Sequence, residues 1–367
     1  MRRRLTLNQR QALLKWGCLT LSVIMLVGTF CAIPYIVSAL PKMDNDTVRD
    51  LLNGNEAMGG AIPQYPLGGG SLEISEEESL PEENEGEFEG EFEPEYPIPI
   101  PEQGEYDLPV TYQNLAWYDA TEAAALNIIN KTKFTVDLND FLAKKFPISA
   151  TIDEAPLVLI VHTHGSESYL DNGYDFYSPD ETFRSLDEEK TVVHIGEVLC
   201  EKLNSLGIRA VHDKTMYDLT DFNKSYSYSR EGINRYLSEY PTIKFVIDLH
   251  RDSVFDSNGN NIKPLTVLNG KSCAQLMLVV GTNEGGSDHP NWRDNLTFAT
   301  HLQQKMNDFY PTLARPINLR SAAFNQALTK GSVLLEVGSC GNTVEEAENA
   351  VLLFAQAYAS LLKENLK

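Results

Sequence analysis

The sequence has no lysine or arginine between Asp50 and Asn130, although 30 such residues occur in the 367-residue chain. The same stretch carries 19 aspartates and glutamates, which nearly account for the net charge of −22 of the whole chain. A segment this acidic, with few aliphatic residues, buries too little apolar surface to offset its loss of conformational entropy on ordering. The sequence therefore predicts a disordered acidic linker, containing proline and glycine, over residues 41–110.

Cysteine is also scarce, with five residues of this type and no Cys-x-x-Cys pair. This odd and widely spaced set excludes a disulfide framework and a zinc site built from paired thiolates. No stripe of basic residues is present, so the charge pattern gives no indication of nucleic-acid binding. The chain has no internal repeat.

Charge is absent from residues 17–40, a run of 24 mostly apolar positions. As an α-helix rising about 1.5 Å per residue, this run would be roughly 36 Å long, enough to cross a bilayer core of about 30 Å. Five basic residues precede the run, whereas only Lys42 follows it before the acidic Asp44 and Asp46. The positive-inside rule then predicts a cytoplasmic tail at 1–16, a transmembrane helix at 17–40 and an extracytoplasmic remainder. A cleaved signal peptide is the alternative, since the Val-Ser-Ala tripeptide at 37–39 is typical of a processing site.

Apolar runs and helical segments alternate through residues 111–367. We expect strands at 157–162, 208–213, 243–249, 273–281 and 332–338, and helices at 121–147, 188–206, 226–240, 292–309 and 343–364. The strands are continuous apolar runs, as expected where helices cover both faces of a sheet. This alternation predicts one α/β domain with a mostly parallel sheet flanked by helices.

Three of the expected strands lead into side chains that bind metals or transfer protons: His164 with Glu167, His250, and Glu336. Parallel strands bring their carboxyl ends to one edge of a sheet, where ligands of open α/β sheets bind. A catalytic zinc takes three protein ligands and leaves one position for water. The sequence therefore predicts a Zn²⁺ site held by His164, Glu167 and His250, with Glu336 as the general base.

Three neighbouring side chains each allow more than one interpretation. His162 is two positions before His164 and would face the same side of an extended strand, as an alternative ligand or as a group that orients one. Arg251 and Asp252 follow His250 directly. They would orient ligands or hold a substrate carboxylate, or else form a structural ion pair.

Four motifs, in this order, resemble the stage II sporulation protein P family: HTHGSESY at 162–169, DLHRDS at 248–253, VGTNEGGSDHPNWRDNLTFA at 280–299 and FNQALTKGSVLLEVGSCGNTVEEA at 324–347. That family is similar in its catalytic domain to zinc-dependent N-acetylmuramoyl-L-alanine amidases. The resemblance thus implies an amidase-like (phosphorylase/hydrolase-like) domain at 111–367 that hydrolyses the muramoyl–alanine amide of peptidoglycan.

The resemblance also implies roles for individual residues. His164 and His250 match the family's metal-ligand histidines, Glu167 its acidic ligand and Glu336 its catalytic glutamate. In classical amidases the acidic ligand lies well downstream of the first histidine, so the spacing of three residues here departs from that pattern.

The family further implies action during engulfment, in the space between the mother-cell and forespore membranes, with the stage II sporulation proteins D and M as partners. Cleavage of peptide cross-links is a second activity associated with it. Two alternatives stay open: a metallocarboxypeptidase-like enzyme, in which Arg251 or Arg320 binds a terminal carboxylate, and a non-catalytic scaffold that binds the cell wall. The polar loops expected at 170–187 and 253–264 favour a groove for a hydrated polymer over a closed pocket.

Overall fold

The computed structural model describes residues 103–104, 107–116 and 126–367, which belong to a compact unit spanning Glu91–Lys367. The expected basic tail, the transmembrane helix and nearly all of the acidic linker lie outside these described residues, so they stay predictions. Within the described residues, no helix is long and apolar enough to cross a membrane.

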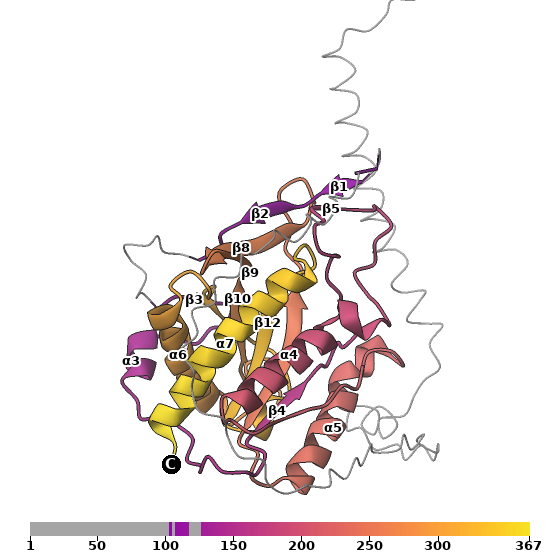
Figure 1. Cartoon of the computed structure of the whole chain (residues 1–367). Coiled ribbons are helices and arrows are strands. Elements are labelled where there is room, and N and C mark those ends of the chain that lie inside the picture. The colour runs from indigo at the N-terminus through magenta and orange to yellow at the C-terminus, as the bar shows by residue number, and fades with distance from the viewer. Residues whose placement is uncertain (1–102, 105–106, 117–125) are drawn as a thin grey trace, which may run out of the picture. The chain divides into compact units, whose positions relative to one another are not determined.

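A seven-stranded sheet lies at the centre of the domain, in the strand order β3-β11-β10-β12-β7-β4-β6 (Figure 1). Its strands are β3 (Ile128–Asn130), β4 (Val158–Val161), β6 (Ala210–His212), β7 (Phe245–Asp252), β10 (Leu276–Gly281), β11 (Ile317–Arg320) and β12 (Gly331–Ser339). All neighbours in this sheet are parallel except β10 and β12, which are antiparallel. The sheet is therefore mostly parallel, as the sequence predicts, but mixed.

Helices pack on both faces of the sheet. On one face lie α4 (Val192–Ser205), α6 (Trp292–Phe309) and α7 (Val344–Asn365), and on the other lies α5 (Ser225–Glu239). The alternating side chains of β4 show the two faces: Ile160 packs in the large core with α4, whereas Leu159 and Val161 pack in the smaller core under α5. Two covered faces explain why the central strands are apolar throughout.

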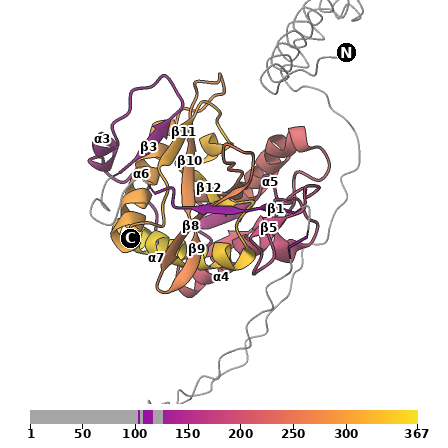
Figure 2. The ribbon, with the colours of Figure 1, turned by 90° about the horizontal axis from the view of Figure 1, so that it is seen from above.

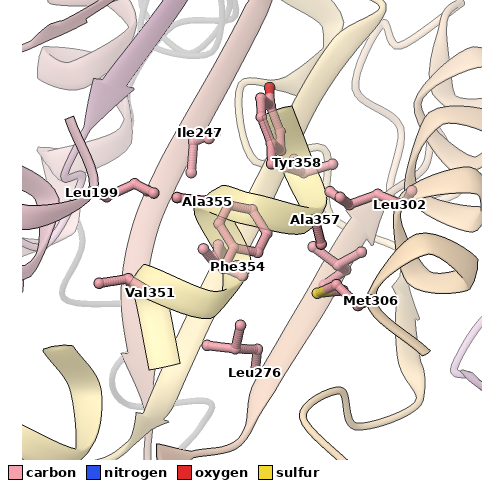
Figure 3. Close-up of a cluster of buried hydrophobic side chains, with 14 of the residues drawn as sticks. Leu199, Ile247, Leu276, Leu302, Met306, Val351, Phe354, Ala355, Ala357 and Tyr358 are labelled. Atoms are coloured by element: carbon pink, nitrogen blue, oxygen red, sulfur yellow. The ribbon is translucent and has the colours of Figure 1, made fainter. Parts of the chain in front are cut away.

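The large core fixes α7 against the sheet. Figure 3 shows side chains that meet there from α4, α6, α7 and the sheet, namely Leu199, Leu302, Met306, Phe354, Tyr358, Ile247 and Leu276. Each fully buried Leu, Ile or Phe contributes about 1.5–3 kcal/mol relative to an exposed side chain. The first turn of α7 carries the expected capping box, in which the Thr343 hydroxyl accepts from the Glu346 amide and the Glu346 carboxylate accepts from the Thr343 amide.

The segment at 107–116 joins two smaller sheets at the end of the domain where α7 begins. Its strand β1 (Leu108–Pro109) pairs antiparallel with β5 (Phe176–Tyr177), and its strand β2 (Thr111–Gln113) pairs parallel with β8 (Ile262–Leu268). The strand β9 (Lys271–Ala274) completes a three-stranded sheet in the order β2-β8-β9. Figure 2 shows this segment crossing the domain from β5 to β8.

Two of the expected elements are wrong. Within 126–147, where a helix is expected, the chain forms the edge strand β3 and one short helix, α3 (Leu138–Leu142); residues 121–125 lie outside the described part. The single strand expected at 273–281 is two strands, β9 and β10, separated at Gln275. The side chain of Gln275 donates to the Thr312 carbonyl oxygen and accepts from the Leu115 amide, so this residue joins neighbouring segments.

Candidate metal and catalytic site

The strands β4, β7 and β12 lie side by side and run parallel, so their carboxyl ends meet at one edge of the sheet. In the register, Glu336 of β12 lies beside His250 of β7. His164 and Glu167 lie in the turn that follows β4, which ends at Val161. The expected convergence of three strand ends is confirmed.

The structure brings His164, Glu167 and His250 together. The ring centroids of His164 and His250 are 5.4 Å apart, with the ring planes at 83°. Nδ1 of His250 lies 3.4 Å from Oε2 of Glu167. Nδ1 of His164 is buried and has no hydrogen-bond partner among the described residues. A buried nitrogen without a partner next to a carboxylate and a second imidazole is suited to bind a ligand.

Asp248, which the sequence analysis did not select, lies at ion-pair distance from His250. Its Oδ1 lies 3.0 Å from Nε2 of His250, and its carboxylate also accepts from the amide and hydroxyl of Thr163. A carboxylate that holds one imidazole nitrogen leaves the other nitrogen for a metal. Burial alone would lower the pKa of His250, but the carboxylates of Asp248 and Glu167 raise it well above its ordinary value. The Asp-x-His spacing, which puts both side chains on one face of a strand, is the sequence signal for this pair.

Glu167 is held in its ionised form. Burial would raise the pKa of Glu167, but the hydrogen bond and charge of His250 and the charge of Arg251 lower it to about 2. The Arg251 amide donates to Oε2 at 3.1 Å, and Nη2 of Arg184 lies 3.6 Å from Oε1. An ionised carboxylate is the form that binds a metal.

The pKa of Glu336 is shifted in the opposite direction to that of Glu167. Its Oε2 is buried and has no hydrogen-bond partner in the part of the chain that the structure describes. Burial, and after it the negative charge of Asp252, raises the pKa of Glu336 to about 8. A carboxyl group with a pKa near neutrality can both accept and donate a proton, as a general acid–base group must.

The structure does not bring His162 to this cluster. Its Nδ1 lies 3.0 Å from the Leu249 carbonyl oxygen, and its Nε2 lies 2.7 Å from Nε2 of His212. It packs beside Gly196 of α4, on the face of the sheet opposite α5. The chain turns after β4, so the rings of His162 and His164 face opposite sides although the residues are two positions apart.

Arg251 and Asp252 also have defined contacts. Nε and Nη2 of Arg251 donate to the carbonyl oxygens of Ser168 and Phe183, so this buried guanidinium braces the loop that carries Glu167. Asp252 forms an ion pair with Arg315, with Oδ2 2.9 Å from Nη2. Of the roles expected for these two residues, the structure favours orientation of the ligand loop by Arg251 and an ion pair by Asp252.

Two aromatic side chains beside His164 were missed by the sequence analysis. Phe222, in the 3₁₀ helix η2 (Phe222–Lys224), stacks on His164 with ring centroids 4.5 Å apart and ring planes at 12°. Tyr226, in the first turn of α5, lies edge-on to His164 at 5.7 Å. Both lie about 60 residues downstream of His164, and only the packing of α5 against β4 brings them to it.

The donor set fits a zinc ion in its chemistry. Two ligand atoms at about 2.0–2.1 Å from a tetrahedral zinc lie about 3.3–3.4 Å apart. Nδ1 of His250 and Oε2 of Glu167 are 3.4 Å apart. Across the described ranges, no group of three or more His, Cys, Asp or Glu residues is spaced as a complete metal site. Zinc therefore stays a prediction that rests on the residue types, on this one distance and on the free Nδ1 of His164.

The fold and the site define an α/β domain with two histidines and two glutamates gathered at one edge of its sheet. The family model of stage II sporulation protein P matches residues 75–359, and the chain belongs to this family. Stage II sporulation protein P of Bacillus subtilis (strain 168) is 29% identical over 231 residues, which are 60% of this chain and 54% of that protein. The chain thus spans about half the length of this curated relative.

Solved structures of amidases are distantly similar. An N-acetylmuramoyl-L-alanine amidase from Clostridium difficile 630 is 14% identical with a TM-score of 0.34, over 58% of this chain and 97% of that one. The CwlD amidase from Clostridioides difficile, solved in complex with the GerS lipoprotein, is 13% identical with a TM-score of 0.35, over 57% of this chain and 98% of that one.

Proposed function

We propose that the chain is a zinc-dependent peptidoglycan hydrolase that cleaves the amide bond between N-acetylmuramic acid and L-alanine during sporulation. The observation that carries the proposal is the cluster of His164, Glu167, His250 and Glu336 at one sheet edge. It combines two imidazoles and an ionised carboxylate with a carboxyl group of raised pKa. Membership of the stage II sporulation protein P family supports the role in sporulation.

In this mechanism the chain binds the ion and moves one proton. His164, Glu167 and His250 would hold the zinc, and Asp248 would keep the Nδ1 atom of His250 directed at it. The ion would supply a Lewis acid and an acidified water. A nearby cation lowers the pKa of a carboxyl group, so Glu336 would be ionised in the loaded enzyme. Its Oε2 would then take a proton from the attacking water and give it to the amine of the departing L-alanine.

Product analysis tests which bond is broken. The full chain, purified with zinc and given intact peptidoglycan, is expected to release stem peptides with a free L-alanine N-terminus. Shortened stems that stay attached to glycan would contradict the amidase and support the metallocarboxypeptidase alternative. Of the two arginines that could bind a terminal carboxylate in that alternative, Arg251 is unsuitable, because its guanidinium is buried and donates to backbone carbonyl oxygens. Unchanged peptidoglycan would support the non-catalytic scaffold.

Elemental analysis tests the metal. We expect about one zinc per chain, as for a single catalytic site. The double variant His164→Ala, His250→Ala should lose it, and full retention of zinc by this variant would contradict the assignment. Membrane anchoring, action between the mother-cell and forespore membranes, and partnership with the stage II sporulation proteins D and M belong to the same proposal. They rest on the apolar run at 17–40 and on the family.

A further inference from the structure

Tyr226 is fixed beside the cluster by its backbone as well as its ring. Its carbonyl oxygen accepts a hydrogen bond from Nδ2 of Asn325 at 2.8 Å, and this Nδ2 also lies 3.1 Å from the Ser229 hydroxyl. The same Ser229 hydroxyl lies 2.8 Å from the hydroxyl of Thr163, which donates to Asp248. One network of hydrogen bonds therefore positions both Tyr226 and the carboxylate that orients His250.

The ring of Tyr226 lies beside the cluster, edge-on to His164 with the ring centroids 5.7 Å apart. Burial, and after it the carboxylates of Asp248, Glu336 and Glu167, raise the pKa of Tyr226. The hydroxyl of a tyrosine, whose ordinary pKa is about 10, is protonated at neutral pH and is able to donate a hydrogen bond.

This hydroxyl forms no hydrogen bond within the described residues, and neither does that of Tyr358 in the core, whereas two other tyrosines use theirs. The hydroxyl of Tyr169 donates to the Val337 carbonyl oxygen at 3.0 Å, and that of Tyr217 donates to Asp213 at 2.6 Å. Tyrosines in protein interiors usually have such a partner. The donor of Tyr226 is thus available to a bound molecule, next to the ring of His164.

Hydrolysis of an amide places negative charge on the carbonyl oxygen, and this site is rich in negative groups. The carboxyl groups of Glu167, Asp248 and Glu336 all lie beside His250 in this cluster. The buried guanidinium of Arg251 donates through Nε and Nη2 to backbone carbonyl oxygens. A neutral donor that adds no positive charge to compete with a metal ion is the group that suits this position.

We propose that Tyr226 is a catalytic residue whose hydroxyl donates a hydrogen bond to the scissile carbonyl oxygen as negative charge develops on that oxygen. The proton stays on Tyr226, and no covalent bond to this residue forms or breaks. This role rests on the amide hydrolysis proposed above and adds a transition-state contact to it.

The variant Tyr226→Phe tests the role, because it removes only the hydroxyl and keeps the ring that packs against His164 and Phe324. We expect kcat to fall by about 10²–10³, the loss typical of one oxyanion donor, with KM changed only a few-fold. Tyr228→Phe is the matched control: this residue belongs to the same helix, and we expect wild-type activity from it. Zinc content and thermal unfolding should be the same for both variants and the wild type.

A tetrahedral phosphinate analogue of the muramoyl–alanine amide separates catalysis from packing. Tyr226→Phe should bind this analogue about 10²-fold more weakly than the wild type does, while its affinity for an uncleavable ground-state analogue is unchanged. Activity of Tyr226→Phe within threefold of the Tyr228→Phe control would overturn the proposal. Loss of zinc, or equal losses of affinity for both analogues, would make Tyr226 a structural residue and also overturn it. If instead the wild type releases no stem peptides, the proposed function itself has failed.

Discussion

Glu336 and Glu167 are both buried carboxyl groups in one site, and their surroundings give them opposite proton affinities. The hydrogen bond and charge of His250 lower the pKa of Glu167 to about 2, whereas burial without a hydrogen-bond partner at Oε2 raises that of Glu336 to about 8. Pairs of carboxyl groups whose pKa values are pushed apart in this way divide the work of an acid–base site. The division argues for Glu167 as a ligand and Glu336 as the proton carrier.

Replacement of Glu336 by glutamine tests this division. Glutamine keeps the shape of the side chain but cannot accept the proton, so we expect the rate to fall by about 10²–10⁴ with zinc content unchanged. Release of stem peptides from peptidoglycan and elemental analysis measure the two quantities. Loss of zinc together with activity would make Glu336 a ligand, and activity near that of the wild type would make it structural.

Asp248 is expected to act on the metal through His250. The variant Asp248→Asn keeps the size of the side chain but weakens the hold on Nε2 of His250. We expect zinc affinity, measured by competition with a chelator, to fall by about 10- to 100-fold, the usual cost of losing such a partner. Glu336→Gln serves as the control, because it should leave zinc affinity unchanged. Equal affinity in all three proteins would show that Asp248 does not orient a ligand.

At the scale of elements, β4 and β6 meet through a pair of neutral histidines. Burial lowers the pKa of His162 to about 4, and burial with the neighbouring His162 lowers that of His212 to about 2. Both rings stay neutral in the folded chain below the ordinary pKa of 6.5, whereas the unfolded chain takes up protons there. The stability that these rings contribute is therefore complete above pH 6.5 and is lost as the pH falls from 6.5 toward 4.

The variant His212→Gln tests this dependence. Each such histidine should lower the free energy of unfolding by about 2 kcal/mol between pH 7 and pH 5. Denaturant titrations of the zinc-free chain should therefore show a drop that is smaller by about this amount in the variant than in the wild type. The same drop in both proteins would show that His212 does not stay neutral in the fold.

The segment at 107–116 is expected to stabilise the domain rather than extend the linker. Val110 is buried with Leu170 and Tyr177, and its amide donates to the Asp175 carbonyl oxygen at 2.7 Å. Val110→Ala should lower the free energy of unfolding by about 1–2 kcal/mol, as removal of buried methyl groups does. Tyr112, in the next strand, is 73% exposed, so Tyr112→Ala should change it by less than about 0.5 kcal/mol. Equal small effects would mean that the segment is not part of the folded unit.

Elements with a strong local signal were predictable, and elements defined by distant partners were not. The helix at 292–309 has the expected bounds because its periodicity and its neighbouring turns are local. The strand β3 has three residues and exists through its pairing with β11, almost 190 positions downstream, so the local pattern predicts a helix there instead. The hairpin of β8 and β9 was missed for a similar reason, since its strands pack beside β2 at the domain's end.

The part of the site that lies at strand ends could be predicted from the sequence. His164, Glu167, His250 and Glu336 follow or end apolar runs, and parallel neighbours bring such positions together without further information. The contacts of His162 depend on where the chain leaves β4, and the position of Tyr226 depends on how α5 packs. Neither is encoded in a local pattern, so the sequence alone left the first ambiguous and the second unnoticed.

At the scale of the whole chain, one prediction concerns the side of the membrane on which the folded domain lies. Five basic residues before the apolar run at 17–40 and an acidic segment after it predict that the domain lies outside the cytoplasm. An acidic segment that buries little apolar surface stays open to proteases.

Protease added to cells stripped of their wall is therefore expected to cut within residues 43–110 and to release a folded domain that retains Glu91–Lys367 in large part. A tag at the N-terminus should stay protected in the same cells, because a cytoplasmic tail is out of reach. Cleavage of the tag with the domain left intact and cell-bound would reverse the topology, and release of the domain without added protease would support the cleaved signal peptide.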